Sequence, residues 1–117
     1  KNKKFITLLG TGKARRELIF VDDIADSVIY FMNKKTSENL INIGTGKDLT
    51  IKEYAEFIIK RLKLKLKIKF DKSYPDGTPK KVLDISLAKK YGWVAKTNLQ
   101  KGFDETYKDF LKNKLYL

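Results

Sequence analysis

The chain has 117 residues, 42% of them hydrophobic and 34% charged, which is typical of one globular domain with one core. Cysteine and histidine are absent, which excludes disulfides, thiolate metal sites and the usual proton carrier at neutral pH. No apolar run approaches the ~20 residues of a membrane span, and the N-terminal residues lack the features of a secretory signal. We therefore expect a cytoplasmic protein with no membrane partner and no metal.

A net charge of +12 raises the question of nucleic-acid binding. Of the 26 basic residues, however, all but Arg15, Arg16 and Arg61 are lysines. These lysines are spread along the chain, many of them on helix faces that must contact water. We therefore expect no nucleic-acid partner. The alternative is a stand-alone basic module that binds nucleic acid or another polyanion.

The N-terminal third reads as strand, strand, helix. Residues 5–9 (FITLL) and 18–21 (LIFV) are apolar and rich in β-branched or aromatic side chains, which predicts two short strands. Asp22 and Asp23 are suited to cap a helix over about 23–34. The apolar side chains of that helix recur at helical spacing and predict a buried stripe. Because the chain begins almost directly in a strand, we expect it to be part of a longer protein.

The middle of the chain continues the alternation. Residues 40–43 (LINI) predict a third strand, which a Gly-Thr-Gly turn ends. Residues 50–53 (TIKE) form a capping box that opens the next helix. Residues 64–70 (LKLKIKF) alternate apolar and lysine side chains, the period of a half-buried strand. Residues 71–81 hold both prolines and an Asp-Gly pair, and predict an irregular loop.

The C-terminal third begins with an extended path over residues 82–85. Ser86 is predicted to cap a short helix that stops at Gly92, and Trp93 to pack on the core. A second capping box at 97–100 opens a terminal helix with an aromatic face. The fold class that follows is α/β, a small domain of alternating strands and helices with mainly parallel strands.

Two nucleotide-binding motifs are approached but not met. The sequence GTGK occurs at 10–13 and 44–47, yet neither copy has the upstream glycine or the Ser/Thr of a P-loop, and neither extends to GxGxxG. Tyr30 and Lys34 have the spacing of the proton-transfer pair of short-chain dehydrogenases. No Gly-rich dinucleotide unit precedes them here, so we interpret that spacing as coincidence. No catalytic, cofactor-binding or metal-binding residue is predicted in the chain.

Two segments are candidates for ligand binding. Arg15 and Arg16 offer rigid cationic forks that suit phosphate, although either could instead pair with Glu17 or another nearby acid. The loop from Asp76 to Lys81 (DGTPKK) combines one carboxylate with two lysines. Such a loop can hold a sugar hydroxyl and a phosphate, or can be a plain surface turn. The residues alone leave both alternatives open at each segment.

Three stretches taken together carry a family resemblance: GTGKARRELIFVDDIADSVIYFM at 10–32, LINIGTGKDLTIKEYAEFI at 40–58 and PDGTPKKVLDISLAKKYGW at 75–93. They resemble the C-terminal part of GDP-L-fucose synthases, which are extended short-chain dehydrogenase/reductases. The first two contain patterns shared by many nucleotide-sugar epimerases and dehydratases. The third is more characteristic of the fucose synthase branch.

The resemblance implies an enzyme that epimerises GDP-4-keto-6-deoxy-D-mannose at C3 and C5 and reduces its C4 ketone with NADPH. In that family an N-terminal Rossmann half binds NADP(H) and carries the catalytic residues, and the C-terminal half binds the GDP-sugar. Residues 1–117 would then be the substrate-binding domain, inactive alone. Its implied partners are the GDP-sugar, its own Rossmann domain and a second copy in a homodimer.

By position, the resemblance assigns four substrate-binding residues. Arg16 matches the arginine on the substrate diphosphate, Asp76 a substrate-contacting aspartate, and Lys81 a basic residue near the nucleotide. Leu9 occupies a position where the family often has tryptophan. Leucine keeps the apolar contact but loses the stacking surface and the N–H donor, so a related GDP-deoxysugar or a heptose is an alternative substrate.

Overall fold

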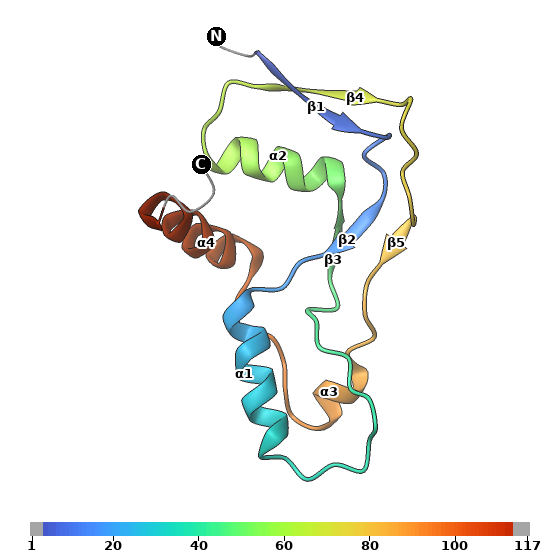
Figure 1. The fold of residues 1–117 in the computed structure, drawn as a ribbon, viewed down its shortest axis with the longest axis vertical. Coiled ribbons are helices and arrows are strands. Elements are labelled where there is room, and N and C mark those ends of the chain that lie inside the picture. The colour runs from blue at the N-terminus through green and yellow to red at the C-terminus, as the bar shows by residue number, and fades with distance from the viewer. Residues whose placement is uncertain (1–3, 114–117) are drawn as a thin grey trace. The chain divides into compact units, whose positions relative to one another are not determined.

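The computed structural model describes residues 4–113. It is a mixed α/β structure (Figure 1), with elements in the order β1 (Phe5–Leu9), β2 (Arg15–Glu17), α1 (Val21–Met32), β3 (Asp48–Thr50), α2 (Ile51–Arg61), β4 (Lys67–Asp71), β5 (Lys80–Lys81), α3 (Ser86–Lys90) and α4 (Leu99–Asn113). The contacts divide the chain into two compact units: a first unit of Lys1–Glu17 and Lys47–Val82, and a second unit of Leu18–Gly46 and Leu83–Leu117.

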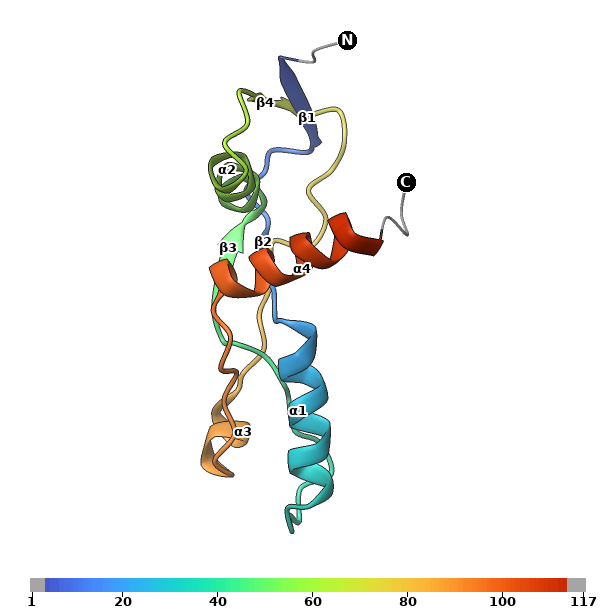
Figure 2. The ribbon, with the colours of Figure 1, turned by 90° about the vertical axis from the view of Figure 1, so that its left-hand side faces the viewer.

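The first unit contains two small sheets. Strands β1 and β4 pair in parallel, with Phe5 opposite Lys67 and Leu9 opposite Asp71. Strand β2 lies between β3 and β5, and is parallel to β5 but antiparallel to β3. In both ribbon views α2 lies beneath the β1–β4 pair (Figure 1 and Figure 2). The prediction of mainly parallel pairing is therefore confirmed, with β2–β3 as the exception.

Helix α2 is defined at both ends by local hydrogen bonds. The predicted capping box is present: the Glu53 amide donates to Thr50 Oγ1 at 3.1 Å, and the Thr50 amide donates to Glu53 Oε2 at 2.6 Å. At the other end the Lys63 amide donates to the Lys60 carbonyl and the Leu64 amide to the Ile59 carbonyl, the two bonds of a Schellman motif. Lys63 has a φ of 52°, a left-handed conformation that normally selects glycine.

The second unit is built on a polar face of α1. Trp93 is 3% exposed, as the sequence predicted it to be buried, and its indole N–H donates to Asp26 Oδ2 at 3.1 Å. The Tyr30 hydroxyl donates to the Tyr91 carbonyl at 2.7 Å. Asp23 is 6% exposed and accepts hydrogen bonds from the Thr97 amide at 2.9 Å and the Thr97 hydroxyl at 3.2 Å. The face of α1 that contacts the rest of this unit is therefore polar.

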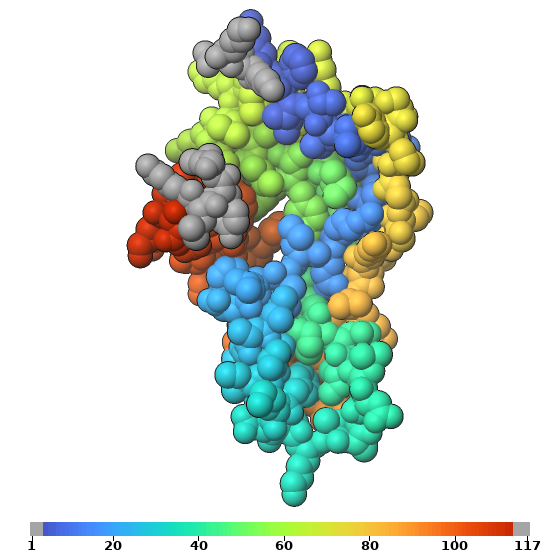
Figure 3. Space-filling model, viewed as in Figure 1, coloured from blue at the N-terminus to red at the C-terminus, as the bar shows by residue number. Residues whose placement is uncertain are grey.

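The predicted apolar stripe of α1 is wrong for the described structure. Ile24, Val28 and Met32 are 42%, 54% and 80% exposed, while Phe31 is half-buried. The space-filling view shows α1 and the segment that follows it at the surface of this unit (Figure 3). Helical periodicity identified an amphipathic helix correctly. It did not identify which face the unit buries, because hydrogen-bonding partners rather than apolar contacts select that face.

Two predicted strands are also absent. Residues 18–21 do not form a strand, since the strand lies three residues earlier at Arg15–Glu17 and α1 already begins at Val21. Residues 40–43 are irregular. A strand requires a hydrogen-bonded neighbour, and the described residues of the second unit contain no strand that could supply one. Residues 40–43 therefore do not form a strand, although their side chains favour one.

Three helix starts differ from the prediction. The N-cap of α1 is Phe20, which makes no side-chain cap, and Asp22 and Asp23 lie inside the first turn. Helix α4 is capped by Asn98, whose Oδ1 accepts from the Lys101 amide at 2.9 Å, because Thr97 is bound to Asp23. Helix α3 begins at Ser86, whose amide donates to the Asp84 carboxylate.

The later strands follow the sequence more closely. The alternating stretch at 64–70 forms β4, although the strand begins only at Lys67, after the turn that ends α2. Ile68 and Phe70 are half-buried while Lys67 and Lys69 are exposed, as the alternation predicted. The predicted loop at 71–81 is irregular up to the two-residue strand β5 at its end.

The left-handed residue at the end of α2 provides a stability test. The substitution Lys63→Gly should raise the free energy of unfolding by about 0.5–1 kcal/mol. In the left-handed conformation the Cβ atom of lysine lies too close to a backbone carbonyl oxygen, and glycine has no Cβ atom. Chemical denaturation of the two proteins measures the change. Lys65→Gly, two residues on and not in a left-handed conformation, is the matched control and should be neutral or destabilising. A Lys63→Gly variant no more stable than this control would contradict the assignment of strain.

Candidate functional site

All four predicted substrate-binding residues lie in the first unit. Leu9 ends β1, Arg16 is in the middle of β2, Asp76 is in the loop after β4, and Lys81 ends β5. Asp76 is brought to the turn that follows Leu9, and Arg16 is brought beside Lys81. The structure thus brings these residues together in two pairs, one at the glycine turn and one across β2–β5.

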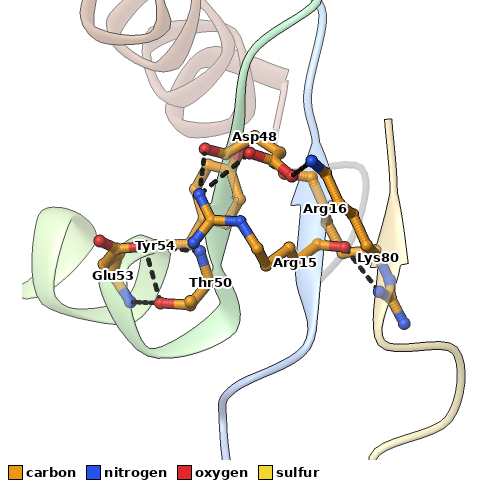
Figure 4. A network of polar contacts seen from close by, with 7 residues as sticks. All are labelled: Arg15, Arg16, Asp48, Thr50, Glu53, Tyr54 and Lys80. Carbon is orange, nitrogen blue, oxygen red and sulfur yellow. Dashed lines mark hydrogen bonds and ion pairs between the residues drawn. The ribbon is translucent and has the colours of Figure 1, made fainter. Parts of the chain in front are cut away.

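Strand β2 sends the two arginines to opposite faces of its sheet, as expected for neighbouring strand positions (Figure 4). Arg15 Nη2 donates to Asp48 Oδ1 and to the Asp48 carbonyl, both at 3.0 Å. Lys80 Nζ lies 3.8 Å from the other oxygen of the same carboxylate, which is only 12% exposed. The hydrogen bond from Arg15 holds the pKa of Asp48 below its usual value. For Arg15, the alternative of an ion pair with a nearby acid is therefore confirmed.

Arg16 is held differently. Its Nη1 donates to the Arg15 carbonyl at 2.6 Å and to the Thr78 carbonyl at 2.8 Å. Its own carbonyl accepts a hydrogen bond from the Tyr54 hydroxyl at 3.0 Å, which fixes the backbone at this point. No carboxylate in residues 4–113 pairs with its guanidinium. Carbonyl groups therefore orient Arg16 without neutralising its charge.

Lys81 lies beside Arg16 on the same face. The two residues are in register across the parallel β2–β5 pair, just as Arg15 is in register with Lys80. Registered positions of neighbouring strands lie about 5 Å apart and point to the same side of the sheet. Lys81 is exposed and has no acidic partner among the described residues. One face of β2–β5 thus carries an ion-paired cluster, and the other carries two adjacent, unneutralised cations.

Asp76 binds the glycine turn. Its Oδ1 accepts from the Thr11 amide at 2.5 Å, and its Oδ2 accepts a short hydrogen bond from the Thr11 hydroxyl. These bonds lower the pKa of the Asp76 carboxyl. Gly10 has a φ of 81°, and a Cβ at that position would lie 2.3 Å from Asp76 Oδ1. The close approach therefore requires glycine, and both carboxylate oxygens of Asp76 are engaged in shaping the loop.

Thr11 is a site residue that the sequence analysis missed. Its position between two glycines identified a turn, and nothing in the sequence indicated that a carboxylate 65 residues away would bind both its amide and its hydroxyl. Leu9, which precedes the turn, is 60% exposed. An exposed apolar side chain at the end of a strand and beside a polar turn is available for contact with a ligand.

The Tyr30–Lys34 pair does not form a proton-transfer site in this structure. Tyr30 and Lys34 lie in the second unit, where the tyrosine hydroxyl is bound to the Tyr91 carbonyl and Lys34 Nζ lies 5.7 Å from the Tyr30 ring centroid. Between residues 4 and 113, acidic side chains do not gather into a cluster that could hold a metal ion. None of the helices described is long and apolar enough to cross a membrane.

Comparison with known proteins shows which proteins the chain is similar to. The sequence profile of the NAD dependent epimerase/dehydratase family matches residues 1–44. The chain is 39% identical over 112 residues to a probable GDP-L-fucose synthase 1 of Oryza sativa subsp. japonica, covering 96% of this chain and 34% of that protein.

Solved structures agree with this relationship. A GDP-6-OMe-4-keto-L-xylo-heptose reductase of C. jejuni matches with a TM-score of 0.84 at 35% identity, over 93% of this chain and 34% of that one. The GDP-mannoheptose C4 reductase MlghC of Campylobacter jejuni, solved with NADP bound, matches with a TM-score of 0.81 at 32% identity, over 92% and 35% of the two chains.

The chain is therefore similar in sequence and in fold to part of a class of nucleotide-sugar epimerases and reductases. Within that class it is similar to GDP-L-fucose synthases and to GDP-heptose reductases. It spans about a third of the length of the relatives it matches.

The bond between Asp76 and Thr11 makes the stability of the protein depend on pH. Because the folded state lowers the pKa of Asp76, its contribution is complete above the ordinary aspartate pKa of about 3.9. The contribution is lost as the pH falls through the lower folded value. We expect Asp76→Asn to reduce the free energy of unfolding above pH ~4, and the difference from the unsubstituted protein to shrink below it.

Denaturant titrations across this pH range measure the difference directly. Asp22→Asn, an exposed position on α1, controls for the general effect of losing a carboxylate. A difference between the Asp76→Asn and unsubstituted proteins that grows as the pH falls would contradict the role given to this carboxyl group.

Proposed function

We propose that this chain is the substrate-binding part of an NADP-dependent GDP-sugar epimerase/reductase, one that makes GDP-L-fucose or a related GDP-deoxysugar. The observation that carries the proposal is the pair of unneutralised cations, Arg16 and Lys81, on one face of β2–β5. A diphosphate carries two adjacent negative groups and suits two adjacent cations. The homology to GDP-sugar enzymes supports the choice of ligand.

The two cations contribute differently to this role. The planar guanidinium of Arg16 can donate two parallel hydrogen bonds to phosphate oxygens, and its contacts with the Arg15 and Thr78 carbonyls orient it before the ligand arrives. Preorganisation reduces the conformational entropy lost on binding. Lys81 is a flexible point charge that can follow the second phosphate or the nucleotide.

Asp76 and Leu9 shape the rest of the proposed site. With both carboxylate oxygens bound to Thr11, Asp76 acts by holding the glycine turn and the 76–81 loop together. That loop delivers the Thr78 carbonyl to Arg16 and leads into β5. Leu9 supplies an apolar contact next to the turn. The role of Asp76 as a direct substrate contact stays a prediction, because each oxygen of an ionised carboxylate can accept a further hydrogen bond.

The cofactor and the chemistry are proposed to lie on the remainder of a longer polypeptide. Residues 4–113 contain no Gly-rich βαβ unit and no Tyr-Lys pair free to transfer a proton, so they do not fit a dinucleotide site. NADP(H) would bind an N-terminal Rossmann domain, in a cytoplasmic enzyme that forms homodimers. The comparisons offer no support for the alternative of a stand-alone basic module.

Determining the coding sequence upstream of Lys1 tests the proposal that a Rossmann domain precedes this chain. We expect the reading frame upstream of Lys1 to encode a Gly-rich βαβ unit followed by a Tyr-x-x-x-Lys pair. The reason is that the relatives are about three times as long as this chain. An upstream region without such a unit would contradict the proposed cofactor site, while leaving the anion site on β2–β5 to be tested separately.

The anion site is tested by substitution in the full-length protein. Arg16→Ala should weaken GDP binding by ~1.5–3 kcal/mol, roughly ten- to a hundredfold in Kd, because a charge-assisted contact is lost. Calorimetric titration with GDP measures the change. Arg16→Lys should recover part of the affinity, since it keeps the charge but loses the fork.

Lys101→Ala, at an exposed position on α4, is the control and should bind GDP as the unsubstituted protein does. Circular dichroism establishes that each variant is folded. A folded Arg16→Ala variant with undiminished affinity for GDP would remove Arg16 from the site.

A further inference from the structure

An open groove runs between α2 and β4 in the first unit, with a volume of about 660 Å³. Its floor is apolar and includes Ile59 of α2 and Ile68 and Phe70 of β4. None of the residues that line it belongs to β1. The groove therefore borders the edge of β4 that β1 leaves open. It carries none of the four residues proposed to bind the nucleotide sugar.

That edge of β4 presents main-chain groups that no strand among residues 4–113 pairs with. The Lys67 amide donates to the Lys4 carbonyl at 3.0 Å, and the Asp71 carbonyl accepts from the Gly10 amide at 2.8 Å, so these residues face β1. In a parallel pair, alternate residues of one strand face the same neighbour. The amide and carbonyl groups of Ile68 and Phe70 consequently point to the open side, where they can pair with another strand.

The rim of the groove is positively charged. Four lysines line it, and the single acidic residue, Glu56, is already engaged with Lys52 at 3.7 Å. Lys60, Lys63 and Lys67 are exposed, and no acidic side chain in the described chain pairs with them. An occupant of this groove must therefore bring negative charge, and apolar side chains to cover the floor.

We propose that an acidic, extended segment of a partner protein binds here as an added strand on the open edge of β4. Its main chain would pair with Ile68 and Phe70, apolar side chains on one face would contact the floor, and carboxylates would meet Lys60, Lys63 and Lys67. Addition of a strand beside a helix is an established mode of peptide recognition, in which the main chain provides affinity and the side chains specificity.

The lysines of the rim could also serve either of two different roles. Lysines on an edge strand can protect it from pairing with other chains, in which case no peptide binds. A polyanion site would bind nucleic acid through charge alone, without main-chain pairing. The unpaired edge and the apolar floor favour a polypeptide, because neither feature helps to bind a phosphate backbone.

A seven-residue peptide of alternating glutamate and valine, labelled with a fluorophore, tests the proposal against the full-length protein by fluorescence anisotropy. We expect saturable binding that weakens at least tenfold when alternate peptide nitrogens are methylated, since this removes the main-chain donors and keeps the charge. The double variant Lys60→Glu/Lys67→Glu should lose at least tenfold in affinity.

The double variant Lys101→Glu/Lys108→Glu makes the same change of charge on α4, which contributes no residue to the lining of the groove, and should bind the peptide normally. No binding of the alternating peptide would overturn the proposal. Equal affinity for the methylated peptide, or for single-stranded DNA of the same charge, would also overturn it, because charge alone would then account for binding. GDP titration of the same variants separates this result from the sugar-nucleotide proposal.

Discussion

The alternation of side chains along the three-residue strand β2 determines the chemistry of the first unit. Arg15 and Arg16 are adjacent in sequence, and a strand is the one regular conformation that directs adjacent side chains to opposite faces. On one face, Arg15 and Lys80 share the carboxylate of Asp48. On the other, no carboxylate in the described part of the chain pairs with Arg16 or Lys81. A helix at the same position would have presented both arginines to the same half of its surface.

The two faces of the strand leave different groups available to a ligand. Asp48 is 12% exposed and is bound by a guanidinium, so its partner cations remain in place and do not compete for an incoming anion. Tyr54, which follows the capping box of α2, bonds to the carbonyl of Arg16 and links that helix to β2. Local features that only define a helix start, such as Thr50 and Glu53, thereby help to fix the geometry of the candidate site.

Local patterns in the sequence predicted what is determined locally. The capping box at Thr50, the alternation at Lys67 to Phe70 and the burial of Trp93 are all confirmed, because each depends on short-range hydrogen bonds or on one strongly apolar side chain. The family resemblance selected Arg16 and Lys81 by position. It could not reveal that the two are in register on one sheet face, which is a property of strand pairing.

The failures have a common physical cause, which is pairing between distant segments. Residues 40–43 have the composition of a strand but no described neighbour in their unit. Asp23 is of a residue type that often caps helices, yet its carboxylate binds Thr97, 74 residues away. The bond between Asp76 and Thr11, 65 residues away, was likewise not predicted. In each case the partner is invisible to a pattern read over a window of a few residues.

The link between Asp23 and Thr97 also sets the order in which the protein can assemble during synthesis. Each unit combines two separated stretches, and the first unit closes with Val82, while the second needs residues beyond it. When α1 leaves the ribosome, the amide and hydroxyl that its buried carboxylate will bind have not yet been made. The first unit can therefore fold on the nascent chain, whereas the second waits for the last third of the sequence.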